Sequence, residues 1–136
     1  MYIDTSCLAA YYLPEPKSDT VQKIIQQNET IIISYLTEIG LLSAIRKSQR
    51  IGELSENDGN KTWNLFKSHR KSGLFDIAEL DVDVFKSAEL LMETTSTALR
   101  SLDAIHLGIA HAYRFDLYTF DKTMIRVANE FKIKLV

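Results

Sequence analysis

The sequence opens on Tyr2-Ile3-Asp4-Thr5-Ser6, where a short apolar run meets an aspartate and then two hydroxyl residues. Apolar residues of this kind favour a buried strand, and hydroxyl side chains directly after it are typical helix caps. The pattern predicts a strand over residues 1–4 that leads into a helix over residues 7–13. Asp4 would then end the strand, where a carboxylate in apolar surroundings costs free energy unless something compensates it.

Strand-like and helical patterns alternate along the rest of the chain. Further strands are predicted over residues 30–33, 74–80, 117–120 and 133–136. Helices are predicted over residues 18–28, 34–50, 55–72, 101–113 and 121–130, and another helix begins at Asp81 or Asp83. We therefore predict one α/β domain over residues 1–136, with a central, mostly parallel five-stranded sheet flanked by helices on both faces.

Three more acids lie at the edges of apolar elements, as Asp4 does. Glu38 follows the second strand, Asp103 lies in the first turn of its helix, and Asp121 follows the strand over 117–120. In open α/β sheets the carboxyl ends of parallel strands meet at one edge, so these acids are expected to share it. Each acid also has a local explanation, such as a plain helix cap for Asp121 or a helix N-terminus for Asp103.

A divalent cation is the simplest shared compensator for four carboxylates. Cys7 is the only cysteine, which excludes an internal disulfide and zinc–thiolate sites. Oxygen-only ligands favour Mg²⁺ or Mn²⁺. Such an ion can lower the pKa of a bound water and stabilise displacement at phosphorus, which is the chemistry of phosphodiester hydrolysis.

These stretches resemble the motifs of a known family, the PIN-domain proteins. The opening run, together with Leu13-Pro14-Glu15-Pro16, resembles their first motif, and Ser34-Tyr35-Leu36-Thr37-Glu38 resembles their second. The third motif, which is the most specific, is matched by residues 99–107, and the fourth by Leu117-Tyr118-Thr119-Phe120-Asp121. The compact length of 136 residues is similar to that of VapC-type toxins of toxin–antitoxin pairs.

The resemblance implies an endoribonuclease that depends on Mg²⁺ or Mn²⁺. By motif position Asp4, Glu38, Asp103 and Asp121 would form the catalytic and metal-binding quartet, with Glu38 as a ligand or as the group that orients the attacking water. Thr5 or Ser6 would support the metal site through a hydroxyl. The resemblance also implies an RNA substrate, a cognate protein antitoxin and a homodimer.

Charge and composition limit how this chain could bind RNA and where it could be located. The chain carries 16 Lys and Arg against 18 Asp and Glu, a net charge of −2. A protein that coats nucleic acid non-specifically is usually basic, so a nucleic acid would be bound here only at a local site, as a substrate. Candidate phosphate contacts are Arg100, Lys122 and Arg126. His106 is expected to be a buried, hydrogen-bonded histidine rather than a general base. The sequence lacks a signal peptide or a bilayer-length apolar run, which predicts a cytoplasmic protein without a membrane partner.

Two alternatives stay open at this point. The chain could be a catalytically silent PIN module that binds RNA or protein, although such a module has no reason to retain four repelling carboxylates. It could also be a phosphatase of another α/β family with Asp4 as nucleophile. Those enzymes usually carry a second aspartate two residues later, where this chain has Ser6.

Overall fold

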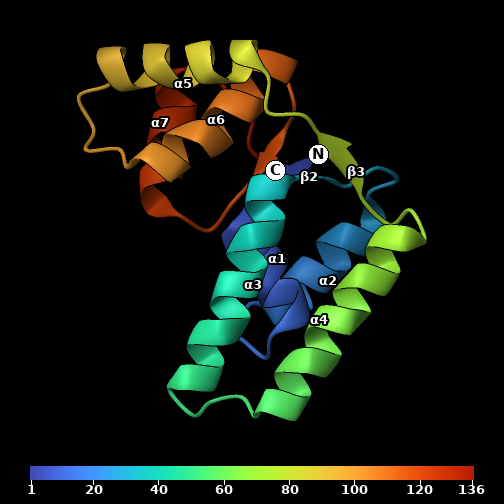
Figure 1. The fold of residues 1–136 in the computed structure, drawn as a ribbon. Helices are drawn as coiled ribbons and strands as arrows, with labels where there is room; N and C mark the ends of the chain where they lie inside the picture. The colour runs from blue at the N-terminus through green and yellow to red at the C-terminus, as the bar shows by residue number, and fades with distance from the viewer.

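The computed structural model describes all 136 residues, folded into seven helices and four strands (Figure 1). In chain order the elements are β1 (Tyr2–Ile3), α1 (Thr5–Tyr12), α2 (Ser18–Gln27), β2 (Ile32–Ser34), α3 (Tyr35–Arg50), α4 (Glu56–Lys71), β3 (Asp76–Ala78), α5 (Val82–Thr94), α6 (Ser101–Tyr113), β4 (Leu117–Tyr118) and α7 (Lys122–Glu130). None of the helices combines the length and the apolar character needed to cross a bilayer.

The sheet has the strand order β3-β2-β1-β4, and all three strand pairings are parallel. The prediction of a parallel sheet is therefore confirmed, whereas the prediction of a fifth strand over residues 133–136 is wrong. That segment makes one isolated bridge, between Leu135 and Leu117. Only Leu117 exchanges hydrogen bonds with it, through its N–H and its carbonyl oxygen, because β4 itself is two residues long.

Helices cover both faces of the sheet, as the sequence predicts. Alternate residues of a strand point to opposite faces, and so Ile3 packs into a core with α1 to α4 while Tyr2 packs into a second core with α5 to α7. Figure 1 shows these two groups of helices on opposite sides of the short strands. The carboxyl ends of the strands are thereby left between two helical layers.

Side-chain caps start the helices that leave this edge of the sheet. The carboxylate of Asp4 accepts the Cys7 N–H at 3.0 Å, so α1 begins at Thr5, earlier than predicted, and the cap is the acid rather than a hydroxyl. Ser34 caps α3 and Asp121 caps α7, both as predicted. The strand-to-helix turns therefore place polar groups at one edge.

Candidate active site

A cavity of about 640 Å³ opens beside the carboxyl ends of β1 and β4, and three carboxylates line it. Asp4 comes from the end of β1, Asp121 from the start of α7 and Asp103 from the first turn of α6. The other lining residues are hydroxyl, small, apolar and cationic residues and one histidine: Thr5, Ser6, Ala9, Leu36, Ile39, Gly40, Ser43, Ala44, Lys47, Arg100, Leu102 and His106. Acids from distant stretches of sequence thus share one cavity.

Asp4 is buried, with 3% of its surface exposed, and the protein itself supplies its hydrogen-bond donors. The Ser6 hydroxyl donates to both carboxylate oxygens, at 2.8 and 3.0 Å, and the Cys7 N–H donates at 3.0 Å. The Thr119 hydroxyl donates to Oδ2 at 2.7 Å. Donors of this kind compensate a buried carboxylate, so the folded chain tolerates Asp4 without requiring a cation.

Thr119 connects two of the acids, and the sequence analysis missed it. Besides donating to Asp4, its Oγ1 accepts the Asp121 N–H at 3.0 Å. The Asp121 carboxylate accepts the Met124 N–H at 2.9 Å as the cap of α7. A threonine two residues before a strand-end aspartate is the signal that could have identified this residue, because a hydroxyl there can bond the following backbone.

Asp103 forms an ion pair with Arg100 at the cavity. Its side chain is 15% exposed, and Oδ2 accepts a hydrogen bond at 3.0 Å from Nε of Arg100, whose side chain is 80% exposed. This hydrogen bond and the charge of Asp103 raise the pKa of the Arg100 guanidinium. Arg100 therefore lies at the mouth of the cavity, positioned to meet an anion there.

The sequence as a whole places this fold and this set of acids in a known family. The family model described as PIN domain matches residues 1–130. The chain belongs to the PIN domain family. No curated protein sequence matches the chain.

Solved structures share the fold of this PIN domain at low sequence identity. The toxin VapC20 of Mycobacterium tuberculosis superposes with a TM-score of 0.70 at 15% identity, over 92% of both chains. The VapBC2 structure from Rickettsia felis gives 0.69 at 17% identity, over 99% of this chain and 96% of that one. FitAcB from Neisseria gonorrhoeae gives 0.68 at 17% identity, over 94% and 92%. These similarities concern the fold alone.

The fourth predicted acid, Glu38, does not line the cavity. The face of α3 that does so carries Gly40, and two residues along a helix correspond to a rotation of about 200°. Glu38 lies on another face of α3, where its Oε1 accepts a hydrogen bond from Arg70 Nε in α4. The structure brings three of the four predicted acids together, and the predicted ligand role of Glu38 is not supported by this arrangement.

Gly40 allows α1 and α3 to approach closely beside the acids. A Cβ at this position would lie 2.2 Å from Oγ1 and 2.9 Å from Cβ of Thr5. Any side chain at position 40 would therefore push Thr5 away from the cavity wall. Thr5 and Ser6 both line the cavity, and their role in supporting a metal site stays a prediction.

His106 lies at the cavity wall within a buried hydrogen-bonded group. Its Nδ1 is 2.6 Å from the Tyr2 hydroxyl, and its Nε2 is 3.4 Å from Thr5 Oγ1. The Tyr2 hydroxyl also lies 3.0 Å from Ser34 Oγ and 3.3 Å from Thr37 Oγ1. Burial lowers the pKa of His106 and raises the pKa of Tyr2. The neutral forms of both residues therefore hold together β1, α3 and α6 behind the acids.

Two of the three predicted phosphate contacts lie elsewhere. Lys122 and Arg126 are exposed on α7 and do not line the cavity, whereas Arg100 does. Lys47, near the C-terminal end of α3, is a second cation on the cavity wall, and the sequence analysis missed it. Lys47 lies outside all four motifs, so its local sequence did not indicate a place at the cavity.

The chemistry of the acids suits a hard cation, because three carboxylates and two hydroxyls offer oxygen ligands only. However, no group of three or more His, Cys, Asp or Glu side chains lies close enough together to hold one metal ion in this structure. Asp4 bonds to protein donors, and Asp103 is turned toward Arg100. The types of ligand atom fit Mg²⁺ or Mn²⁺, but the carboxylate oxygens do not meet at one point where an ion could bind all of them.

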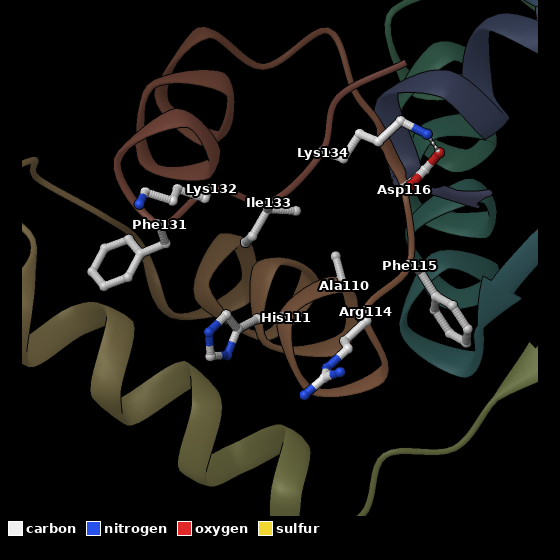
Figure 2. Close-up of a pocket in the computed structure, with 9 residues that line it drawn as sticks. All are labelled: Ala110, His111, Arg114, Phe115, Asp116, Phe131, Lys132, Ile133 and Lys134. Carbon is white, nitrogen blue, oxygen red and sulfur yellow. Dashed lines mark hydrogen bonds and ion pairs between the residues drawn. The ribbon is translucent and has the colours of Figure 1, made fainter.

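A smaller hollow of about 310 Å³ lies at the opposite end of α6 (Figure 2). It is rich in cations, but Lys134 is paired with Asp116, and Figure 2 shows the charged ends of Lys132 and Arg114 well separated. These groups do not converge on a ligand. The acidic cavity is therefore the candidate active site of this PIN domain.

Proposed function

We propose that this PIN domain is a metal-dependent endoribonuclease that hydrolyses RNA phosphodiester bonds, acting as the toxin of a toxin–antitoxin pair. The observation that carries the proposal is the presence of Asp4, Asp103 and Asp121 around one cavity at the edge of the sheet. Support comes from the matching PIN family and from solved structures of the same fold. VapC20 is described as a toxin that cleaves the sarcin–ricin loop.

Asp4, Asp103 and Asp121 would hold Mg²⁺ or Mn²⁺ in this proposal. A bound ion supplies neutralisation of phosphate charge and promotes ionisation of the attacking water. Arg100 and Lys47, on separate parts of the wall, would each contact a phosphate of the RNA and so hold the chain across the acids. The Thr5 hydroxyl, beside His106 Nε2, can bond an oxygen of the substrate or a water.

A protein antitoxin is part of the proposal. The solved structures of related fold include a toxin–antitoxin complex from Klebsiella pneumoniae, with a TM-score of 0.62 at 18% identity. The rim of the acidic cavity carries exposed apolar side chains, with 66% of Ile39 and 60% of Leu102 exposed. A partner with apolar residues beside a cationic one would complement both this rim and the acids.

The decisive experiment is cleavage of RNA by the purified chain with MgCl₂, with MnCl₂ and with excess chelator. We expect cleavage with either metal, none with chelator, and loss of cleavage in Asp103→Asn. Glu93→Gln, which removes a carboxylate that is exposed on α5 and does not line the cavity, serves as the matched control and should cleave normally. Equal cleavage by the parent with and without chelator would reject the mechanism.

A catalytically silent PIN module is the second candidate. Two observations favour it: the acids do not form a metal site, and Glu38 is bonded to Arg70. Binding of RNA or of a protein partner without cleavage under all metal conditions would establish this alternative.

A further inference from the structure

A second hollow, of about 300 Å³, adjoins the acidic cavity and shares Ser6 and Ala9 with it. Its other walls include Lys17, from the turn before α2, and Phe120, from the segment after β4. Segments that are about a hundred residues apart in the sequence thus meet beside the acids. The two hollows form one continuous surface, with the carboxylates at one end.

Lys17 and Phe120 are in direct contact in this second hollow. The Lys17 ammonium lies 3.9 Å from the centre of the Phe120 ring, within the range of a cation–π interaction. Lys17 is exposed and forms no ion pair, and Phe120 is only partly buried. A cation without an ion-pair partner therefore covers an aromatic ring that becomes accessible when the exposed Lys17 side chain moves.

The position of the Phe120 ring is tied to that of the first catalytic carboxylate. The backbone N–H of Phe120 donates to Ser6 Oγ at 3.2 Å, and the same hydroxyl donates to Asp4. The ring also packs edge-on against Tyr118, at 5.3 Å between centroids and 67° between planes. Asp121 is the next residue, so the backbone that carries the ring is linked to two of the three acids.

This pairing has the composition of a nucleotide subsite. Single-stranded nucleic acids are held by bases stacked on aromatic rings and by phosphates paired with cations. Glu15 lines the same hollow, and its negative charge disfavours more than one phosphate there. The space suits a single nucleotide, which would be a neighbour of the one at the acids.

We propose that Lys17 and Phe120 form a subsite for one nucleotide of single-stranded RNA next to the scissile phosphate. On binding, the flexible Lys17 side chain leaves the face of the Phe120 ring to pair with the phosphate of that nucleotide, and the base stacks on the ring face so exposed. The proposal rests on the proposed function in taking the acids as the site of cleavage. It assigns the two residues to substrate positioning and to the choice of cleavage site.

Direct binding tests the subsite separately from cleavage. Labelled single-stranded RNA oligonucleotides are titrated, in the presence of chelator, with Asp103→Asn alone and with Phe120→Leu or Lys17→Gln added. We expect Phe120→Leu to weaken binding about tenfold, because a stacked base depends on the ring. We expect Lys17→Gln to weaken binding several-fold and to lower the slope of log K against log salt by about 0.7, the value for one phosphate contact.

Matched controls use residues of the same types away from the hollow. Lys23→Gln removes an exposed cation from α2, and Phe85→Leu removes a partly exposed ring from α5. Binding by these variants should equal that of the Asp103→Asn background. Thermal unfolding of each variant separates a folding defect from a binding defect, and Lys17→Gln leaves the apolar core untouched because Lys17 is exposed.

Measurements of RNA cleavage and of antitoxin binding complete the test. With metal and the wild-type acids, both subsite variants should raise KM more than they lower kcat, and Phe120→Leu should change the nucleotide preferred beside the cut. RNA binding unchanged in both subsite variants, or lost equally in the controls, would overturn the inference. It would also be overturned if the variants weakened binding of a protein antitoxin alone. If the parent chain never cleaves RNA but the subsite variants still weaken RNA binding, the subsite is supported and only the proposed function is rejected.

Discussion

The substitution Thr119→Val tests whether the protein itself compensates the buried charge of Asp4. Valine has nearly the shape of threonine, so the change removes the hydroxyl without creating a large cavity. The hydroxyl donates to Asp4 Oδ2 at 2.7 Å and accepts the Asp121 N–H at 3.0 Å, and Thr119 is 6% exposed. Water is therefore poorly placed to replace it.

The expected cost follows from these two bonds. A hydrogen bond to a charged group contributes about 1.5–3 kcal/mol, so Thr119→Val should lower the free energy of unfolding by about 2 kcal/mol. For a chain of this size the melting temperature should fall by about 6–8 °C. Urea titration followed by circular dichroism, with differential scanning calorimetry, measures both quantities. Thr20→Val, at an exposed position of α2, should change stability by less than about 0.5 kcal/mol.

A double-mutant cycle with Asp4→Asn identifies the source of the cost. If Thr119 stabilises the charge of Asp4, then Thr119→Val should cost only about 1 kcal/mol when Asn replaces Asp4, as for a neutral hydrogen bond. The reasoning is refuted if Thr119→Val leaves stability unchanged. An equal cost in both backgrounds would likewise refute the link to the Asp4 charge.

Three further predictions concern residues around the cavity. Glu38→Gln should lower stability by no more than about 1 kcal/mol, because its partly exposed pair with Arg70 is weak, and RNA cleavage should persist; an abolished activity at full stability would return Glu38 to the site. Gly40→Ala should destabilise the chain by about 1–2 kcal/mol despite the better helix propensity of alanine, since its Cβ would lie 2.2 Å from Thr5 Oγ1; urea titration would contradict this by showing a gain. Burial lowers the pKa of His106 in the folded chain. As the pH falls below about 6.5, the unfolded chain therefore binds this proton before the folded chain does. The free energy of unfolding should fall by up to about 1.4 kcal/mol per pH unit, until the pKa of the folded state is reached. Urea midpoints measured between pH 7.5 and 5 should show a smaller decline in His106→Asn, and an equal decline would exclude His106 as the cause.

The sequence was sufficient to predict the parallel sheet and the three acids at its edge, because each of these depends on local pattern. Asp4 and Asp121 follow apolar strands directly, and Asp103 begins a helix, so their positions follow from strand ends and helix starts. Ile133–Val136 has the residues of a strand but pairs at one residue only, because pairing also depends on the length of its neighbour.

The face that α3 turns toward α1 explains the main difference between the predicted and the observed site. Glu38 and Gly40 lie on different faces of one helix, and the sequence alone does not show which face meets α1. The close approach of Thr5 to Gly40 decides it, which is a tertiary contact between residues 35 positions apart. Lys47 was missed for the same reason, since it reaches the cavity only through the tertiary fold. Thr119 had a local signal in its place two residues before Asp121, but its bond to Asp4 depends on the pairing of β1 with β4.

The carboxylate of Asp4 both faces the cavity and starts the first helix of the chain. A substitution there would reduce the amount of folded protein as well as alter the cavity, so a loss of activity in such a variant cannot distinguish the two effects. Asp103 has a single side-chain partner and no capping role. A variant that removes one carboxylate of the cavity and keeps the fold is therefore better made at Asp103 than at Asp4.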